Sequence, residues 1–360
     1  MKKKNLIIVN TYFQLMTIIN MCLNNLKEDV NDLIVTDKSA DMEEKINKLK
    51  EYNIFENIYY VKSKDICIDK NKVKKYLTYL FDRKKILTVE LKEVYDYLYF
   101  FNYDLLTYCT IDEIAKKNKN VKCKKYDEGF ISYLYDVKNN NINNIVRKLL
   151  LRKNIDKSIE AYYLYHPDLI CYDSKYPIEK IKVLDKSDEK LKSIYNNIFN
   201  YTKDKIKQKY IFFEESFFCD GGKDVNDLEL ILKIAETVGK ENLLVKLHPR
   251  NKINRFAEYG IATNKTIGIP WELIQMNDDF SDKVLLTISS GSVLASKLYF
   301  NDNIKTFLLF NCTDKMSNMV TEKYFEYLKK LENKFGLDNF IIPKNEEEFL
   351  KKLNESKMND

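Results

Sequence analysis

The sequence is poor in the residues that mark several common binding motifs. It contains eight glycines in 360 residues, and it has neither a G-x-G-x-x-G fingerprint nor a P-loop. The two best-known glycine-rich phosphate loops are therefore excluded. Histidine occurs only at His166 and His248, and the one tryptophan is Trp271. Chemistry that needs an imidazole consequently has two candidate positions.

The cysteines are few and scattered. There are seven, an odd number, and none forms a C-x-x-C pair. This distribution argues against a disulfide framework and against a structural zinc site, and it indicates reduced thiols. No apolar run approaches the roughly 20 residues that span a bilayer. The first ten residues also lack the long apolar core and cleavage site of a signal peptide. We therefore expect a cytoplasmic protein.

Neither sign of charge dominates the chain. The chain has 60 Lys and Arg against 54 Asp and Glu, a net charge of +6. A mixed surface argues against nucleic-acid binding, which needs a concentrated basic patch. One basic amphipathic stretch, 146–153, is interpreted as a solvated helix, with contact to an anionic membrane surface as the alternative.

Strand and helix patterns alternate in both halves of the chain, which predicts parallel sheets covered by helices on both faces. Hydrophobic residues make up 45%, enough for two cores. We predict an α/β protein with two Rossmann-like domains facing a central cleft. The first domain covers 1–180, a linker region 181–209, and the second domain 210–360. Strands are expected at 6–9, 32–36, 58–61, 97–102, 210–213, 242–247, 283–288, 304–310 and 340–342, and helices include 73–82 and 89–97.

The most informative segment is Val245–Arg250. An apolar strand ends there in His248 and Pro249, with Lys246 and Arg250 on either side. In open α/β sheets the carboxyl ends of strands line the ligand site, so this imidazole is well placed to meet a phosphate. The alternative is a buried histidine with a purely structural role.

Two further motifs suit nucleotide binding. Ser289 and Ser290 end a predicted strand, where they either cap a helix or offer hydroxyls and backbone N–H groups to an anion. Glu272 follows Pro270 and Trp271 at a predicted helix start. Its carboxylate either accepts hydrogen bonds from ribose hydroxyls or complements the helix dipole.

Acidic residues cluster at two other places in the chain. Asp127, Glu128 and Gly129 form either a surface turn or a site beside a flexible backbone residue. Residues 214–222, which include Asp220 and Gly221, follow the first strand of the second half. Neither site has the D-x-D pattern that holds nucleotide-bound metals. His166 lies in a connecting region and is interpreted as structural.

The order of these motifs is more specific than any one of them. A first strand leads into residues 10–15, and the motifs around Asp127, His248, Glu272 and Ser289 follow in that order. This order resembles the bacterial lipooligosaccharide sialyltransferases of glycosyltransferase family 52 and related bacterial polysialyltransferases. The resemblance covers roughly 5–310. The chain departs from the family pattern at residues 215–216, which are Glu-Ser where Gln-Pro is expected.

The resemblance implies a GT-B enzyme that uses CMP-sialic acid without a metal or another cofactor. By position, His248 contacts the donor phosphate and assists departure of CMP, and Pro249 packs near the cytosine. Glu272 holds the ribose hydroxyls, and Ser289 and Ser290 bind the phosphate. The remaining candidates on the donor side are Lys246, Arg250 and Gly221.

The resemblance also implies the acceptor side and the general base. Tyr12 and Gln14 are the acceptor-side candidates. Asp220 is the preferred base, and Asp127 and Glu128 are the alternatives. The implied acceptor is a galactose-terminated glycan, lipid-linked as in a lipooligosaccharide and joined by an α-2,3 linkage. Peripheral contact at the inner face of the cell membrane and a homodimer fit this interpretation.

Two competing functions stay open. One is a GT-B transferase that uses a UDP-hexose donor. The other is a non-catalytic protein that binds a nucleotide, a nucleic acid or an anionic lipid.

Overall fold

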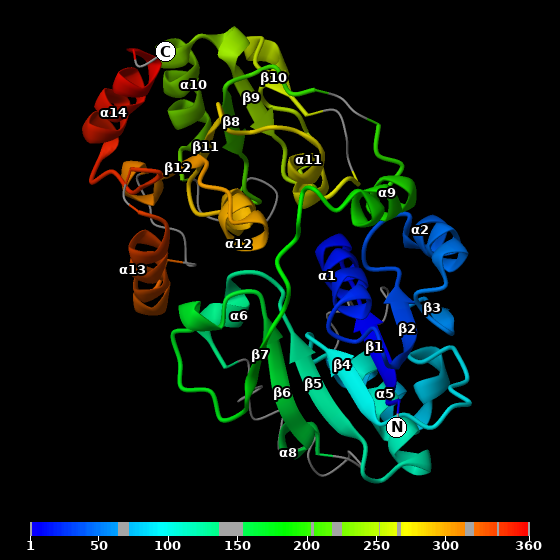
Figure 1. Ribbon diagram of the computed structural model, residues 1–360. Helices are drawn as coiled ribbons and strands as arrows, with labels where there is room; N and C mark the ends of the chain where they lie inside the picture. The colour runs from blue at the N-terminus through cyan, green and yellow to red at the C-terminus, as the bar shows by residue number, and fades with distance from the viewer. Residues whose placement is uncertain are drawn as a thin grey trace. The chain divides into compact units, whose positions relative to one another are not determined.

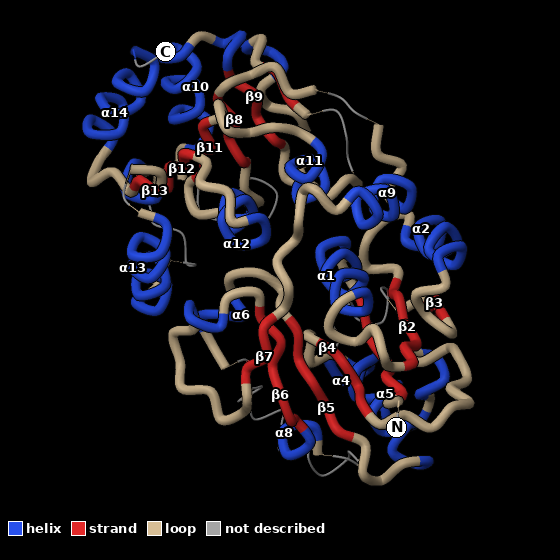
Figure 2. The backbone as a smooth tube through the Cα atoms, viewed as in Figure 1, coloured by secondary structure: helices blue, strands red, loops and turns tan. Residues whose placement is uncertain are grey.

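The computed structural model describes residues 2–63, 72–136, 154–202, 205–217, 225–251, 253–264, 268–313, 320–336 and 338–358 (Figure 1). The chain divides into two compact units. The first comprises residues 1–184 and 188–201, and the second comprises 185–187 and 202–360. Figure 2 shows that strands run side by side in each unit with helices around them. The basic stretch 146–153 lies outside the described residues.

The first unit contains a seven-stranded sheet of order β3-β2-β1-β4-β5-β6-β7. All neighbouring strands in it are parallel. The strands are β1 (Lys4–Val9), β2 (Val30–Thr36), β3 (Ile58–Val61), β4 (Tyr97–Phe100), β5 (Lys122–Tyr126), β6 (Ile159–Leu164) and β7 (Ile178–Lys180). The helices are α1 (Tyr12–Leu23), α2 (Met42–Leu49), α4 (Lys72–Phe81), α5 (Leu105–Lys117), α6 (Ile131–Leu134), α8 (Ile155–Ser158) and α9 (Glu189–Ile198), with 3₁₀ turns η1 (Lys50–Tyr52), η2 (Arg83–Lys85) and η3 (Pro167–Leu169).

The second unit contains a six-stranded sheet of order β10-β9-β8-β11-β12-β13, again parallel throughout. Its strands are β8 (Tyr210–Phe213), β9 (Leu243–Lys246), β10 (Ala262–Thr263), β11 (Val284–Thr287), β12 (Lys305–Leu308) and β13 (Phe340–Ile341). Its helices are α10 (Asp227–Val238), α11 (Trp271–Asn277), α12 (Ala295–Phe300), α13 (Glu322–Phe335) and α14 (Glu346–Met358), with 3₁₀ turns η4 (Lys240–Asn242), η5 (Ala257–Tyr259), η6 (Gly291–Leu294) and η7 (Phe310–Cys312). The predicted class, two α/β units with parallel sheets, is confirmed.

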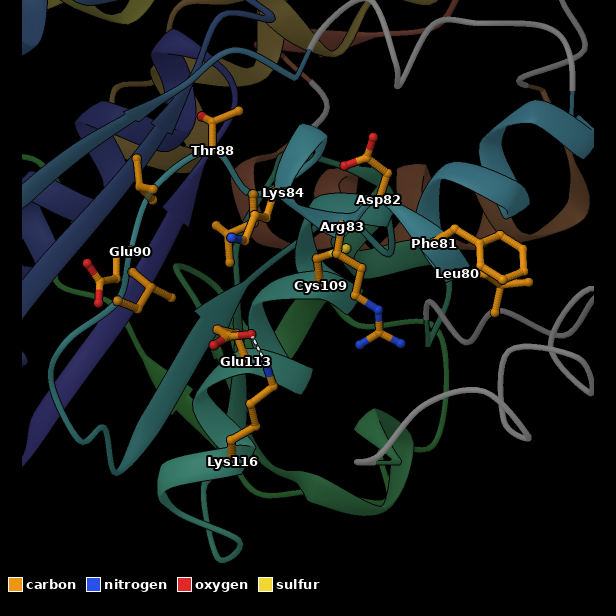
Figure 3. Close-up of a pocket in the computed structure, with 13 residues that line it drawn as sticks. Leu80, Phe81, Asp82, Arg83, Lys84, Thr88, Glu90, Cys109, Glu113 and Lys116 are labelled. Atoms are coloured by element: carbon orange, nitrogen blue, oxygen red, sulfur yellow. Dashed lines mark hydrogen bonds and ion pairs between the residues drawn. The ribbon is translucent and has the colours of Figure 1, made fainter.

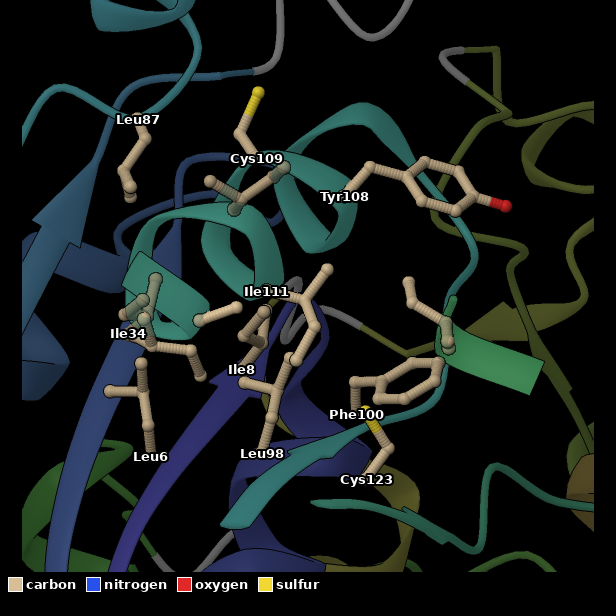
Figure 4. Packing of buried hydrophobic residues seen from close by; sticks show 14 of the residues in the cluster. Leu6, Ile8, Ile34, Leu87, Leu98, Phe100, Tyr108, Cys109, Ile111 and Cys123 are labelled. Carbon is tan, nitrogen blue, oxygen red and sulfur yellow. The ribbon is translucent and has the colours of Figure 1, made fainter. Parts of the chain in front are cut away.

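The core of the first unit follows from the period of two in its strands. Leu6 and Ile8 of β1 lie in one buried cluster with Ile111 of α5, as Figure 4 shows. Successive side chains of a strand point to opposite faces, so Ile7 and Val9 serve the other face of the sheet. Each of these four strand residues is at most 1% exposed. Continuous apolar runs of this kind are typical of strands buried on both faces.

Helix α9 lies within the predicted linker region 181–209 and packs on the first unit. The Tyr195 hydroxyl donates to the backbone oxygen of Met16 at 2.7 Å, and the Asn197 side chain donates to the Tyr52 hydroxyl at 2.8 Å. The first unit therefore extends beyond strand β7 and includes this helix.

The predicted helix at 89–97 is wrong. Residues 89–96 form an irregular connection that leads into β4. The apolar residues that suggested a helix are instead buried side chains that anchor this loop, among them Leu91 and Tyr95. The Tyr95 hydroxyl donates to Asp32 Oδ2 at 2.7 Å.

Strand β5 was not predicted, because its sequence Lys-Cys-Lys-Lys-Tyr is rich in lysine. The fold accommodates these lysines on aromatic rings: Lys124 Nζ lies 3.8 Å from the centroid of Tyr97, and Lys125 Nζ lies 4.8 Å from that of Tyr162. Cation–π contacts of this kind compensate part of the cost of burying an ammonium group.

Candidate functional site

The second sheet has a topological switch point at β8. The chain continues from β8 to β9 on one side of it, and β11 pairs with it on the other side. The loops after β8, β9 and β11 therefore emerge next to one another at the carboxyl edge of the sheet. In open α/β sheets this is the place where ligands bind. The predicted motifs around His248 and Ser289 both lie there.

The loop after β9 is held by a buried carboxylate. The His248 backbone N–H donates to Glu214 Oε2 at 3.0 Å, and the side chain of Glu214 is 0% exposed. Arg255 pairs with Glu214 at 2.9 Å and with Asp227 at 2.6 Å. Because one guanidinium serves two buried carboxylates, the cluster compensates the charge of Glu214 and fixes where the His248 loop begins.

The backbone also fixes the tautomer of the His248 ring. The Arg250 N–H donates to His248 Nδ1 at 3.2 Å. A ring nitrogen that accepts a hydrogen bond carries no proton, so the neutral imidazole has its proton on Nε2. The ring is half-buried. In the neutral ring, the proton therefore lies on Nε2.

Further contacts join the β9 loop to the β8 loop. Arg250 Nη2 donates to Ser216 Oγ at 2.9 Å, and Asn251 Nδ2 donates to the backbone oxygen of Glu215 at 3.2 Å. Pro249 and Arg250 are exposed. The cation therefore stays at the surface of the loop, where it can meet an anionic ligand.

Glu215 connects the β8 loop to the end of β11. Its carboxylate accepts hydrogen bonds from the backbone N–H of Ser289 and from Ser289 Oγ, the latter at 2.9 Å, and Thr287 Oγ1 lies 3.4 Å away. Burial raises the pKa of Glu215 to about 7, although hydrogen bonds from Ser289 oppose this shift. The donors of Ser289 are therefore occupied by a carboxylate of the chain itself.

Ser290 has the capping role that was one of its two predicted uses. Its hydroxyl accepts from the Ser292 N–H at 3.3 Å at the start of η6, and its own N–H donates to Thr287 Oγ1 at 3.1 Å. Behind it, the Tyr324 hydroxyl donates to the Ser289 backbone oxygen at 3.4 Å.

Lys246 and Glu272 are two partly buried charged side chains, and each influences the pKa of the other. Burial raises the pKa of Glu272, and the positive charge of Lys246 opposes this shift. Burial likewise lowers the pKa of Lys246, opposed by Glu272. Trp271, in contrast, belongs to the core, since it is 4% exposed and packs edge-on against Phe213 at 4.7 Å between ring centroids. Glu272 lies in the first turn of α11, as the helix-dipole interpretation expected.

In the first unit, Asp127 and Glu128 have different environments. Asp127 is 0% exposed and accepts hydrogen bonds from the Tyr133 hydroxyl, the Gly129 N–H at 2.8 Å and the Tyr165 N–H at 3.2 Å. Burial raises the pKa of Asp127 to about 6. The turn requires glycine, because Gly129 has a φ of 83°.

Glu128 is only half-buried and lies at the carboxyl edge of the first sheet. Its Oε1 accepts from Thr11 Oγ1 at 3.3 Å, and its N–H donates to Ser132 Oγ at 2.9 Å. Thr11 also caps α1, since its hydroxyl accepts from the Gln14 N–H at 3.2 Å.

The two acceptor-side candidates lie in structural networks. Gln14 is 0% exposed and accepts from the Asn10 N–H at 2.6 Å and donates to Asn102 Oδ1 at 3.1 Å. The Tyr12 hydroxyl donates to the Ala40 backbone oxygen at 2.7 Å. Their role in acceptor binding stays a prediction. Asn10 and Asn102, which follow β1 and β4 at the switch point of this sheet, were not singled out as site residues.

A profile of the alpha-2,8-polysialyltransferase (POLYST) family matches residues 5–311. The chain belongs to the alpha-2,8-polysialyltransferase family. The matched range contains the loops after β1, β5, β8, β9 and β11. The resemblance to sialyltransferases is thus confirmed at the level of the family. The prediction that the protein is a glycosyltransferase is confirmed with it. The lipooligosaccharide role and membership of glycosyltransferase family 52 stay predictions. Among curated proteins, no significant match to the sequence is found.

Solved structures show the fold shared with this family member. Arabidopsis thaliana UGT89C1 complexed with UDP has 12% identity and a TM-score of 0.55, covering 99% of this chain and 91% of that chain. Its complex with UDP-L-rhamnose has 13% identity and a TM-score of 0.53, covering 100% and 90%. A UDP-N-acetylglucosamine 2-epimerase from Rickettsia bellii has 14% identity and a TM-score of 0.47, covering 100% and 97%. The first two support a fold of the GT-B type.

Two predicted site residues of this polysialyltransferase family member, Asp220 (the preferred base) and Gly221, lie outside the described residues. Among the described residues, no group of three or more His, Cys, Asp and Glu side chains is arranged to hold a metal ion. Within the same ranges, no helix is both long enough and apolar enough to cross a membrane. His166 is 3% exposed, consistent with its structural interpretation.

A cavity of about 750 Å³ lies elsewhere in the first unit (Figure 3). Leu80 and Phe81 of α4, residues 87–91 and the later part of α5, including Glu113 and Lys116, line it. The end of α5 and the segment before β4 belong to the amino-terminal edge of the sheet. None of the predicted donor or acceptor residues of the family member lines this cavity.

The ion cluster predicts a large loss of stability for Arg255→Met. This variant leaves the fully buried Glu214 without its cation, which typically costs about 3–5 kcal/mol. Trp271 is the only tryptophan in the chain and is buried in the second unit, so its fluorescence during urea unfolding reports on that unit. The control is Lys352→Met, which breaks the partly exposed pair with Glu348 and should cost less than about 1 kcal/mol. Equal effects of both variants would contradict the proposed role of the cluster.

The raised pKa of Glu215 predicts a pH-dependent stability. Between pH 4.5 and 7 the folded state keeps the proton of Glu215 while the unfolded chain loses it. Stability therefore falls as pH rises through this window, by about 1–3 kcal/mol for this group. Glu215→Gln should lack that component. Urea unfolding followed by Trp271 fluorescence at pH 5 and pH 8 measures it, and identical pH profiles for both proteins would refute the assignment.

Proposed function

We propose that the protein is an inverting sialyltransferase that uses CMP-sialic acid as donor. The observation that carries this proposal is the imidazole of His248. It follows β9, the neighbour of β8 at the switch point of the second sheet. The Arg250 N–H donates to its Nδ1, so the proton of the neutral ring lies on Nε2. The loop of Ser289 and Ser290 ends a strand two places away in the same sheet. Membership of a sialyltransferase family supports the same reaction class.

In this proposal the second unit binds the nucleotide. His248 Nε2–H donates to the donor phosphate, and the exposed guanidinium of Arg250 adds positive charge. Glu272 accepts hydrogen bonds from the ribose hydroxyls, with Lys246 beside it. Pro249 packs near the cytosine, and Gly221 belongs to the same donor side. No metal is assigned a role.

The reaction is a single displacement. The acceptor hydroxyl oxygen forms a bond to the anomeric carbon of sialic acid as the bond from that carbon to the phosphate oxygen breaks. The electron pair of the broken bond leaves with CMP, and His248 and the Ser289 loop stabilise its charge. The hydroxyl proton moves to a carboxylate. Asp220 and Glu128 are the candidates, because Asp127 is fully buried and already accepts three hydrogen bonds.

The acceptor we propose is a galactose-terminated, lipid-linked glycan such as a lipooligosaccharide, joined in an α-2,3 linkage. One finding favours a second candidate: the matching family is described as alpha-2,8-polysialyltransferase. The alternative acceptor is therefore a glycan that already ends in sialic acid. Incubation with CMP-sialic acid and matched acceptors ending in galactose or in sialic acid distinguishes the two. Cytoplasmic location, peripheral membrane contact and a homodimer are parts of the same proposal.

Nucleotide selectivity tests the donor. CMP should raise the midpoint of thermal unfolding more than UMP or UDP at equal concentration. A ligand at 100 times its Kd adds about 2.7 kcal/mol to the stability of the folded state. A donor-hydrolysis assay completes the comparison by measuring CMP release from CMP-sialic acid and UDP release from UDP-hexoses. Stabilisation by UDP alone, with UDP release, would replace this function by that of a UDP-hexose transferase.

Substitution of His248 tests the leaving-group role. His248→Ala should lower kcat by about 10²–10³-fold, the usual cost of one such donor. Unfolding monitored by Trp271 fluorescence verifies that the variant is folded, and His166→Ala is the matched control for loss of an imidazole. Wild-type turnover in a folded His248→Ala protein would remove this residue from the reaction.

Two carboxylate variants identify the base. Asp220→Asn and Glu128→Gln each remove one candidate, and loss of the true base should lower kcat by about 10²–10⁴-fold. The other variant should retain most of its turnover. CMP binding, measured by calorimetry, should change little in either protein, because the base contacts the acceptor hydroxyl. If both variants turn over like wild type, the proton goes elsewhere.

A further inference from the structure

Glu215 occupies both hydrogen-bond donors that Ser289 has. Its two carboxylate oxygens accept from the backbone N–H and from the hydroxyl of the same serine, and Thr287 Oγ1 lies 3.4 Å from one of them. The bidentate arrangement is the one in which an N–H and an O–H hold an anion. In the structure, the carboxyl group of Glu215 occupies this position.

The charge of Glu215 is not balanced in the way that the charge of Glu214 is. Glu214 pairs with Arg255 at 2.9 Å. Within the described residues, Glu215 has only hydroxyl and backbone N–H partners, from Thr287, Ser289 and Ser290. Burial raises the pKa of Glu215 to about 7. The ionised carboxylate therefore binds the serine without a cation, and its displacement breaks no ion pair.

We propose that Glu215 is an internal competitor for the nucleotide phosphate, holding Ser289 until a phosphate displaces it. The inference rests on the proposed function, in which Ser289 belongs to the phosphate subsite. Two anions cannot share the same two donors, and an ionised carboxylate close to a phosphate repels it. Glu215 thus weakens nucleotide binding through the phosphate alone. The effect is strongest for free CMP, whose terminal phosphate carries more charge than the diester of the donor, so that product release is favoured.

The sign of the effect separates this role from a structural one. If Glu215 only oriented Ser289, its replacement would weaken CMP binding or leave it unchanged. If Glu215 competes with the phosphate, a neutral residue of the same shape strengthens CMP binding. Glutamine keeps an oxygen that can accept the Ser289 N–H and removes the charge. Binding of cytidine, which has no phosphate, is unchanged in the competitor role.

The test compares Glu215→Gln with wild type by calorimetry at pH 8, where the carboxylate is ionised, using CMP and cytidine. We expect CMP to bind about tenfold tighter to Glu215→Gln, a change of about 1.4 kcal/mol, with the same affinity for cytidine in both proteins. Glu236→Gln removes an exposed carboxylate near the far end of α10 and is the control for net charge. Glu215→Ala is the second variant in case the glutamine form does not fold, with the same direction expected.

The outcomes distinguish the two levels of the proposal. Equal or weaker CMP binding in Glu215→Gln, with wild type binding CMP, overturns the competitor role and leaves the sialyltransferase proposal intact. A gain for CMP and cytidine alike also overturns it, because the effect would not come from the phosphate. If neither protein binds CMP, the proposed donor fails and the competitor role fails with it.

Discussion

The buried carboxylate of Glu214 is the interaction on which the candidate site depends. It accepts from the backbone of His248 and pairs with Arg255, which also binds Asp227 at the start of α10. Burial removes the hydration of the Glu214 carboxylate, and the cation and hydrogen bonds around it compensate this loss. The cluster therefore fixes the position of the β9 loop when the second unit folds. The imidazole is held at the edge of the sheet before any ligand arrives, and less ordering remains to be achieved on binding.

Two adjacent glutamates at the end of β8 contact different loops of the candidate site. Glu214 contacts the loop after β9, and Glu215 contacts the loop after β11. They differ in charge compensation: one has a guanidinium beside it and the other has hydroxyl and N–H partners. The first arrangement is a permanent structural contact. The second can be exchanged for another anion, which is the physical basis for assigning Glu215 to the control of nucleotide affinity rather than to the framework.

The first unit shows the same separation between support and accessibility. Asp127 is fully buried and accepts three hydrogen bonds, whereas its neighbour Glu128 is half-buried and contacts Thr11 after β1. A pattern of two acidic residues before glycine does not tell which carboxylate is buried and which is accessible, since both follow the same strand. Burial and the number of donors around each oxygen decide it. The same holds for Gln14, whose amide is engaged inside the unit by Asn10 and Asn102.

From the chain alone, the alternation of strands and helices was sufficient for two parallel α/β units, because apolar runs bounded by polar loops are a local signal. The strand ends at His248 and Ser289 were likewise readable, since a strand's carboxyl end is defined by its own residues. Strand β5 was missed because its sequence is rich in lysine, and the rings that Lys124 and Lys125 contact come from other strands. The false helix at 89–97 arose because apolar side chains of this loop are buried, and the Tyr95 hydroxyl binds Asp32, which is distant in sequence. Arg255 and Glu215 gained their meaning only when β9, β8 and β11 became neighbours. Such partners are 28 to 74 residues apart along the chain, and no local pattern encodes a contact over that separation.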